Sequence, residues 1–405
     1  MSSLPARLTA LALLALLTPA CSGPQPARSA AQPPPTPFVI DGHNDLLIHF
    51  TTDSQRAYLG PDGYDIGQRT TGQVDLPRLR AGQVGAAIFT VGVLDTVDRI
   101  RGVQAVTHLF REIAARHPEA LAVVEDSASL VQVAGQGRVA ALFGVEGAEE
   151  LGGSREVLRA AHAAGVRSVG LTWMHTNALG DASTDSARWQ GLSPAGEAFV
   201  RELNRLGMLV DLSHASDSTA MDALAISRAP VILSHSSARA LCPAPRNVPD
   251  ALLQAVALNG GVVMVNFVPY FTSPTHYTWY EEGEARWAEF QAAHPTGDSA
   301  RVLMAAWEKA HPEPPVTLAE VADHVEHVRR VAGIDHVGIG SDFDGMYSKI
   351  PGLEDASRFP ALLAELARRG WSDEELAKVA RGNFLRVLGA VERAAEGGRG
   401  GNRPQ

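Results

Sequence analysis

Eight short apolar segments recur along the chain, each bounded by turn-forming residues. They comprise residues 38–41, 86–93, 139–145, 168–173, 209–212, 231–233, 262–267 and 336–339. Continuous apolar runs of this length are typical of strands that are buried on both faces of a parallel sheet. The segments between them have helical features, and eight strands that alternate with helices predict an α/β fold of the (β/α)8 TIM-barrel type.

The intervening segments carry the signals that begin and end helices. Ser193 suits the N-cap position of a helix, and Gly207 suits the end of the same helix. Thr317 and Glu320 have the spacing of a capping box. Residues 154–164 form another helical stretch that ends at a glycine. These signals support the alternation of strands and helices.

The first 37 residues differ in composition from the rest of the chain. Residues 1–20 contain a run of about ten apolar residues, which is too short to span a bilayer and indicates an export signal peptide. Small residues precede Cys21, as in bacterial lipoproteins, so we expect lipidation of Cys21 and a periplasmic or cell-envelope location. Ordinary signal cleavage close to a cysteine is the alternative. Residues 21–37 are rich in proline and alanine and predict an extended tether.

The remaining sequence predicts one folded domain, residues 38–395, followed by a flexible tail at 396–405. Within the domain, residues 270–315 are too long for an ordinary connection between a strand and a helix, and they are rich in tyrosine and tryptophan. We expect an inserted lid or the contact surface of a homodimer, with Tyr270 binding substrate. An insertion that only packs on the barrel rim is an equally open interpretation.

Residues that can bind metal ions follow five of the eight predicted strands. They are His43, Asp45, Glu146, His214, His235 and Asp342. In a barrel the carboxyl ends of the strands meet at one rim, where enzymes of this fold carry their chemistry. Three imidazoles and several carboxylates gathered there would be costly to desolvate without a counter-charge. A divalent cation supplies that charge.

The composition narrows the choice of metal and partner. The chain has two cysteines, Cys21 and Cys242, which excludes a disulfide framework and a cysteine zinc site. Histidine and carboxylate ligands remain, and this donor set suits Zn²⁺. The formal net charge of −10 argues against a nucleic-acid partner.

The order of the candidate ligands along the barrel suggests two ions. His43 and Asp45 can hold one ion, and His214 and His235, from neighbouring strands, can hold another. Glu146 lies between these groups in strand order and has two oxygens, so we expect it to bridge the ions. A site with a single metal ion is the alternative.

Motifs in order along nearly the whole predicted domain resemble those of the membrane dipeptidase (renal dipeptidase) family of zinc metallopeptidases. They are DGHND (41–45), DLPRLRAGQVGA (75–86), GVEG (144–147), DLSH (211–214), SHSSAR (234–239), RNVPD (246–250), VMVNF (263–267), HVGIGSDFDG (336–345) and GNFLRV (382–387). The resemblance implies a binuclear zinc site with the ligands named above. It also implies that Asp342 transfers protons and that Arg246 binds the terminal carboxylate of the substrate; a structural ion pair with Asp250 is the other interpretation of Arg246.

The sequence departs from the family at one position. Family members carry a histidine after the fourth strand that is thought to contact the substrate oxyanion, whereas Trp173 occupies that position here and His175 follows two residues later. We expect His175 to take the catalytic role through a reshaped loop, or Trp173 to contribute a wall of the substrate site.

The resemblance implies a zinc-dependent dipeptidase that cleaves dipeptides with a free C-terminal carboxylate and extends to substrates with a C-terminal D-residue. One alternative is a related amidohydrolase, such as an N-acyl-amino-acid deacylase or a lactonase. The other is a lipid-anchored binding protein without catalysis.

Overall fold

Eight parallel strands form a closed barrel in the computed structural model, which describes residues 38–50, 64–92, 98–294 and 298–400. In ring order they are β1 (Val39–Asn44), β2 (Val84–Thr90), β4 (Val139–Val145), β5 (Val166–Gly170), β6 (Leu209–Asp211), β7 (Ile232–Leu233), β8 (Val262–Val265) and β9 (Val337–Ile339). The ring closes where Asp41 of β1 pairs with Ile339 of β9. Each barrel strand corresponds to one of the eight predicted segments, so the predicted fold is confirmed.

One further strand, β3 (Leu121–Val123), lies outside the ring and was missed by the sequence analysis. It pairs with the first residues of β4, whereas the last residues of β4 pair with β5. Residues 120–124 are an apolar run, so the sequence carries a signal for this strand, which the prediction of eight segments does not include.

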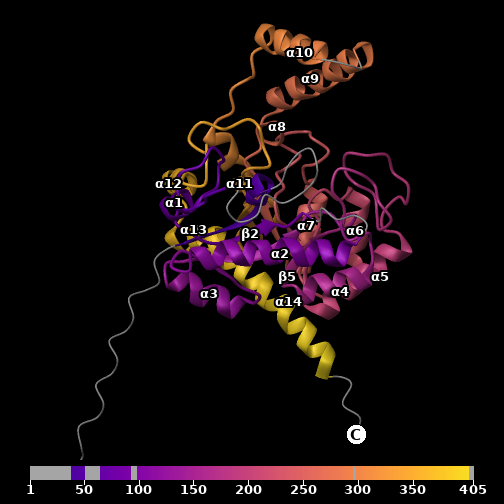
Figure 1. The fold of residues 1–405 in the computed structure, drawn as a ribbon, viewed down its shortest axis with the longest axis vertical. Helices are drawn as coiled ribbons and strands as arrows, with labels where there is room; N and C mark the ends of the chain where they lie inside the picture. The colour runs from indigo at the N-terminus through magenta and orange to yellow at the C-terminus, as the bar shows by residue number, and fades with distance from the viewer. Residues whose placement is uncertain (1–37, 51–63, 93–97, 295–297, 401–405) are drawn as a thin grey trace, which may run out of the picture. The chain divides into compact units, whose positions relative to one another are not determined.

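Helices cover the barrel and its ends (Figure 1). The α-helices are α1 (Leu76–Ala81), α2 (Arg99–Arg116), α3 (Ser127–Gly135), α4 (Arg155–Ala163), α5 (Pro194–Leu206), α6 (Asp217–Ile226), α7 (Asp250–Asn259), α8 (Pro269–Thr272), α9 (Pro274–Ala293), α10 (Ser299–Ala310), α11 (Leu318–Ala332), α12 (Phe359–Arg368), α13 (Asp373–Ala377) and α14 (Asn383–Gly400). Short 3-10 segments, η1 (Leu46–Phe50) and η2 (Ile334–His336), and a π-helical turn, η3 (Lys378–Gly382), complete the described elements.

The predicted helix signals act as expected. Ser193 accepts a hydrogen bond from the backbone of Gly196 at the start of α5, and Gly207 ends that helix with φ 74°. Thr317 and Glu320 form a complete capping box at the start of α11. These contacts satisfy backbone groups that a helix end would otherwise leave without partners.

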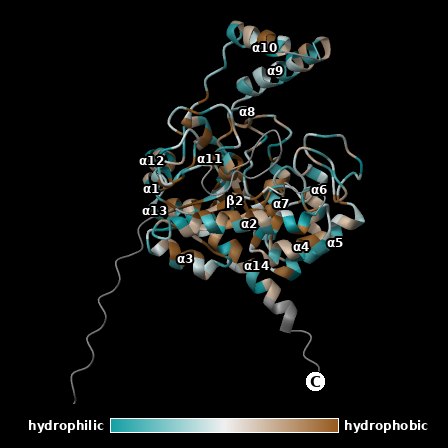
Figure 2. Ribbon diagram, in the orientation of Figure 1, coloured by the Kyte–Doolittle hydropathy of each residue, from teal (hydrophilic) through white to brown (hydrophobic). Residues whose placement is uncertain are grey.

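The core has two layers, because neighbouring strand residues point to opposite sides of the barrel wall. One apolar cluster joins Ile40, Ile88, Leu142, Leu209, Ile232 and Met264 to Phe384, Val387 and Leu388 of α14. The larger cluster joins the alternating strand residues, such as Val39, Phe89, Phe143 and Val210, to the surrounding helices. The first cluster therefore fills the barrel and packs against α14. Figure 2 shows the hydrophobic colour concentrated on the strands and on the helix surfaces that face them.

The predicted insertion consists of α8, α9 and α10. Helices α9 and α10 pack against each other and extend away from the barrel in Figure 1. Tyr270 of α8 stacks on Tyr280 of α9, with ring centroids 4.2 Å apart, and His276 contacts Glu313 at 2.8 Å. The role of this segment as a lid or a subunit contact stays a prediction.

The ends of the chain fall mainly outside the described residues. The predicted signal peptide, Cys21 and the tether all lie there. Helix α14 extends to Gly400, so residues 396–400 of the predicted flexible tail are helical, and 401–405 lie outside the description. Among the described residues, no helix has both the length and the apolar character needed to cross a bilayer.

Two glycines allow the strand ends to approach one another at the rim. A Cβ on Gly42 of β1, or on Gly340 directly after β9, would overlap the carbonyl oxygen of Ser234, which follows β7. Ser234 therefore lies against β1 and β9 only because these two positions have no side chain. This close approach fixes the segment that carries His235.

The variant Gly340→Ala should destabilise the protein, because the new methyl group displaces the Ser234 backbone. We expect a loss of about 1–3 kcal/mol in the free energy of unfolding, the usual range for overpacking, measured by urea denaturation. Gly135→Ala is the matched control, because a Cβ at Gly135 would meet no atom within 4 Å. Equal unfolding midpoints for Gly340→Ala and the parent protein would contradict the close approach.

Candidate active site

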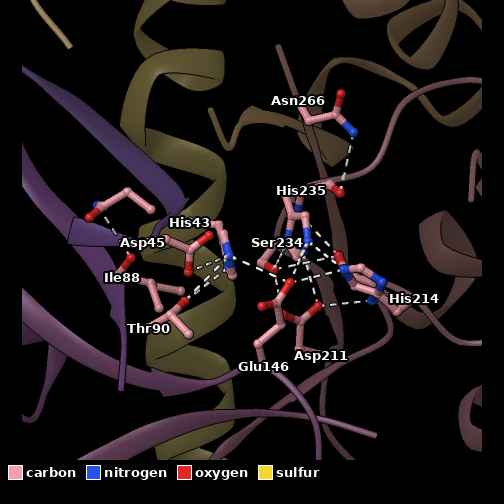
Figure 3. A network of polar contacts seen from close by, with 12 residues as sticks. His43, Asp45, Ile88, Thr90, Glu146, Asp211, His214, Ser234, His235 and Asn266 are labelled. Carbon is pink, nitrogen blue, oxygen red and sulfur yellow. Dashed lines mark hydrogen bonds and ion pairs between the residues drawn. The ribbon is translucent and has the colours of Figure 1, made fainter. Parts of the chain in front are cut away.

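The six predicted metal-binding and proton-transfer residues converge at the carboxyl ends of the barrel strands. His43 lies in β1 and Asp45 directly after it, and Glu146 follows β4. His214, His235 and Asp342 lie within three residues of the ends of β6, β7 and β9. Figure 3 shows the three imidazoles and the Glu146 carboxylate pointing toward one another. Barrel closure thus gathers side chains that are far apart in the sequence.

Three of these side chains place their donor atoms at the corners of a small triangle. Oε1 of Glu146 lies 3.0 Å from Nε2 of His214 and 3.3 Å from Nε2 of His235, and the two Nε2 atoms are 3.0 Å apart. Ligands of tetrahedral Zn²⁺, each at about 2.0–2.1 Å from the ion, are separated from one another by about 3.3 Å. The triangle therefore fits one face of a tetrahedral zinc site.

A second group of possible ligands surrounds His43. Its Nε2 atom lies 3.5 Å from Oδ1 of Asp45 and 3.7 Å from Oε1 of Glu146. His43, Asp45 and Asp342 each offer a ligand atom, and these three atoms lie within 4.8 Å of one another. The ring of His43 also stacks on that of His235, with centroids 3.9 Å apart. Glu146 thus lies between two clusters of donors.

Burial shifts the pKa values of these groups toward their neutral forms. It raises the pKa of Glu146 well above its usual value and that of Asp342 to about 7, and it lowers the pKa of His214 and His235 well below the usual range. Burial alone would also lower the pKa of His43, but the Asp45 and Glu146 carboxylates raise it to about 10. A bound cation would favour the ionised carboxylates and the unprotonated imidazoles.

Two of the site residues have left-handed backbone conformations that are uncommon for residues other than glycine. His214 has φ 68° and Asp342 has φ 67°. Such conformations persist where surrounding contacts hold them, and they cluster at functional sites. For Asp342 the contacts are visible: the Asp41 carboxylate accepts hydrogen bonds from the backbone N–H and the hydroxyl of Ser341, both at 2.7 Å. Asp41 therefore fixes the residue that precedes Asp342.

Arg246 lies beside the metal-binding cluster and is almost completely buried, with 4% of its surface exposed. Its Nη1 donates to the hydroxyl of Ser236 at 2.6 Å, and its Nη2 donates to the carbonyl of His235 at 2.8 Å. Its Nε has no hydrogen-bond partner among the described residues. The alternative pairing with Asp250 is not seen, since Asp250 contacts His327 at 2.6 Å. A buried guanidinium with a free donor is suited to an anionic ligand.

The remaining predicted site residues have different positions. The burial of Tyr270 and the negative charge of Asp342 raise the pKa of the Tyr270 phenol, which lies close enough to Arg246 to interact with it. Trp173 is 44% exposed, and its backbone N–H donates to Glu149 at 3.1 Å. Tyr270 therefore lies on the Arg246 side of the site, whereas Trp173 lies partly exposed in the loop after β5.

His175 is not brought to the cluster, and its expected oxyanion contact stays a prediction. Its side chain is 84% exposed, and its closest charged neighbour is Asp185, at 3.7 Å. The loop is held in this course by its own contacts: the hydroxyl of Thr176 bonds to the Ser186 carbonyl, and the Asp185 carboxylate accepts the Thr176 N–H. A two-residue offset in the sequence does not reveal which way such a loop directs its side chains.

The structure adds residues that the sequence analysis did not assign to the site. The Ser234 hydroxyl contacts Nδ1 of His235 at 2.8 Å and also contacts the Asp211 carboxylate. A Cβ on Gly345 would meet the carboxylates of both Asp45 and Asp342. These residues lie within the motifs noted above, but sequence spacing alone gave no partner for them.

Comparisons with known proteins agree over most of the chain. Residues 35–400 match the family described as membrane dipeptidase (peptidase family M19). Dipeptidase aclJ of Aspergillus oryzae is 39% identical over 369 residues, which cover 88% of this chain and 79% of that protein. Dipeptidase tcpJ of Claviceps purpurea is 36% identical over 375 residues, which cover 89% of this chain and 78% of that protein.

Solved structures give the same result. The probable dipeptidase PvdM from Pseudomonas aeruginosa matches with a TM-score of 0.74 and 27% identity, over 89% of this chain and 96% of its own. A metallo peptidase from Rhodobacter sphaeroides, liganded with a phosphinate mimic of the dipeptide L-Ala-D-Ala, matches with a TM-score of 0.69 and 25% identity. The match covers 87% of this chain and 99% of that chain. The barrel, its rim of ligands and these matches show that the chain belongs to the membrane dipeptidase family, peptidase family M19.

Proposed function

We propose that this protein is a zinc-dependent dipeptidase that hydrolyses dipeptides with a free C-terminal carboxylate. The observation that carries the proposal is the triangle of Glu146, His214 and His235 donor atoms, at 3.0–3.3 Å, beside a buried arginine with a free donor. The dipeptidases that share 36–39% of its sequence support the same reaction.

We further propose two zinc ions in each chain. His214 and His235 would hold one ion, His43 and Asp45 would hold the other, and Glu146 would bridge them. When bound, the cations act as Lewis acids that polarise the scissile carbonyl and activate water. The mixed imidazole and carboxylate donors favour zinc over magnesium or calcium, which prefer oxygen ligands.

Asp342 is suited to move the proton during hydrolysis. In the metal-free chain, burial raises the pKa of this carboxyl group to about 7, and a carboxylate beside the proposed metal ligands is placed to accept and return a proton. Its carboxylate lies in the same cluster as His43 and Asp45. Asp342 would accept a proton from the attacking water and return it to the leaving amine.

Arg246 is suited to hold the carboxylate of the leaving residue. Its contacts with Ser236 and the His235 carbonyl fix the guanidinium close to the proposed metal ligands. A planar guanidinium recognises a carboxylate through paired hydrogen bonds. A terminal carboxylate held so near the reacting centre favours dipeptides over longer chains. Tyr270 would line the same side of the substrate site.

Three finer features are also proposals. Acceptance of a C-terminal D-residue is supported by the L-Ala-D-Ala mimic bound to the metallo peptidase from Rhodobacter sphaeroides, which shares the fold and 25% of the sequence. Export and lipid attachment through Cys21 rest on the sequence of residues 1–37 alone. Pairing of two chains through residues 270–315 rests on the aromatic composition of that segment.

The central test is hydrolysis by the zinc-loaded protein of a panel of L,L and L,D dipeptides, their C-terminal amides and N-acyl amino acids. We expect turnover of dipeptides with a free carboxylate, little turnover of the amides, and loss of activity with a chelator that zinc reverses. Preference for N-acyl amino acids would indicate a deacylase instead. A fully zinc-loaded protein without turnover of any of these would indicate a binding protein.

The variant Asp342→Asn should lower kcat by at least about 10²-fold, the range for loss of a general acid–base group, while zinc content stays at the parental value. Asp335→Asn is the matched control: Asp335 precedes β9 as Asp342 follows it, and it pairs with Lys378 at 2.9 Å, away from the rim. Full activity of Asp342→Asn would remove the residue from the mechanism. Loss of zinc in that variant would make it a ligand.

Zinc affinity should rise with pH between 6 and 8. Without metal, the pKa of His43 is about 10, so its imidazole carries a proton throughout this range and must release it to bind zinc. The proton from His43 alone makes the apparent affinity rise about tenfold per pH unit, and protons released by Glu146 or Asp342 would make the rise steeper. Competition with a chromophoric chelator measures the affinity, and calorimetry in two buffers counts the protons. Equal affinities at pH 6 and pH 8 would contradict this protonation state.

A further inference from the structure

A chain of three buried polar groups leads from Asp211 through Ser234 to His235. The Ser234 hydroxyl lies 2.8 Å from Nδ1 of His235 and bonds to Oδ2 of Asp211. Asp211 is 6% exposed, and Ser234 and His235 are each 1% exposed. The other carboxylate oxygen, Oδ1 of Asp211, accepts the backbone N–H groups of Ser213 and Ser234, both at 3.0 Å. The geometry of this chain is therefore fixed at both ends (Figure 3).

The direction of the hydrogen bonds decides which nitrogen of His235 carries the proton. A hydroxyl group has one proton, and a carboxylate can only accept, so Ser234 donates to Asp211. The hydroxyl oxygen is then an acceptor toward His235, whose Nδ1 must carry a hydrogen to donate. Nε2 of His235 is left without a proton, and its lone pair faces Glu146 and His214.

The other two site imidazoles have no comparable partner. Nδ1 of His214 has no hydrogen-bond partner in the part of the chain that the structure describes. The hydroxyl of Thr90 lies 3.4 Å from Nδ1 and 3.3 Å from Nε2 of His43, so it does not distinguish the two nitrogens. Among these three imidazoles, His235 is the one whose protonated nitrogen is set by a directed hydrogen bond.

We propose that Asp211 and Ser234 are positioning residues that hold His235 with its proton on Nδ1, and so set the affinity of the ion shared by His214 and His235. This inference rests on the proposed zinc site and names two residues that position one of its ligands. Neither residue is among the proposed metal ligands or the proposed substrate contacts. They act through His235, because an imidazole binds a metal through the nitrogen that has no proton.

Two substitutions separate this role from ordinary packing. Ser234→Ala breaks the relay of hydrogen bonds from Asp211 through Ser234 to His235. The imidazole of His235 can then carry its proton on either nitrogen. Asp211→Asn goes further. The backbone N–H groups of Ser213 and Ser234 require the amide oxygen at the Oδ1 position, so the amide NH2 faces the Ser234 hydroxyl. Ser234 can then donate to Nδ1 of His235 at 2.8 Å, a shorter contact than the 3.4 Å to the Ser213 hydroxyl. This favours the imidazole proton on Nε2, where it blocks the metal-binding nitrogen.

The experiment measures zinc affinity for each equivalent by chelator competition in the full chain, together with zinc content. We expect Ser234→Ala to lower the affinity for one of the two zinc ions by about 10–100-fold. Asp211→Asn should lower the affinity for the same ion more strongly. Ser237→Ala is the matched control. Ser237 is fully buried in the same segment, but its hydroxyl bonds to Asn266 at 3.2 Å, outside the relay, so its zinc affinity should match that of the parent.

A second measurement keeps the inference testable if the variants lose stability. Selective ¹⁵N-histidine labelling of the metal-free protein, with the signal assigned through a His235→Gln variant, reports the protonated nitrogen directly. We expect the proton on Nδ1 in the parent and on Nε2 in Asp211→Asn. The same nitrogen protonated in both proteins, or zinc affinities equal to that of Ser237→Ala, would overturn the relay.

These outcomes also separate the inference from the proposed function. A parent protein that binds zinc and cleaves dipeptides, combined with unchanged affinities in both relay variants, would reject the relay alone. A parent protein that binds no zinc would reject the proposed function, and with it the metal-binding consequence of the relay.

Discussion

The structure depends on the convergence of three possible metal ligands at one buried point of the barrel rim. The Glu146 carboxylate and the Nε2 atoms of His214 and His235 lie within 3.3 Å of one another in a buried site. Burial keeps the two imidazoles neutral, so they bring lone pairs rather than positive charge to this point. A bound cation would compensate the burial of these groups, and the barrel holds them in place.

Barrel closure and local backbone contacts share that task. The ring of strands brings β4, β6 and β7 to one rim, and the missing side chains at Gly42 and Gly340 let the Ser234 segment pack against β1 and β9. Left-handed backbone at His214 and Asp342 then directs these side chains inward. The backbone strain is small beside the apolar burial of the barrel core, which is why a rigid barrel can support strained residues at its rim.

Much of this arrangement could be predicted from the sequence, for physical reasons that also explain the failures. The strands of a parallel barrel are buried on both faces and therefore appear as continuous apolar runs, and ligands that follow such runs must meet at one rim. Strand β3 lies in a similar apolar run, residues 120–124, but such runs do not show which strands join the ring and which lie outside it. The exposed position of His175 could not be predicted, because the path of the loop after β5 depends on contacts such as Asp185 with Thr176, which no periodicity reveals. The contact of Ser234 with Asp211 joins two strand ends and could be seen only in three dimensions.

The segment that follows β7 contacts both the proposed metal ligands and Arg246. His235 faces the metal cluster through its side chain, and its backbone carbonyl accepts a hydrogen bond from Arg246. The Ser236 hydroxyl also accepts from Arg246 and lies 3.3 Å from the hydroxyl of Ser213, which in turn accepts the backbone N–H of His235. The position of Arg246, the proposed carboxylate-binding residue, is therefore set by the same short segment that positions His235, a proposed metal ligand. Arg246 and His235 are held by the same segment, so the distance between the proposed carboxylate-binding point and the proposed metal-binding point is fixed. A fixed distance restricts the length of a substrate that contacts both points, and this accounts physically for a preference for dipeptides.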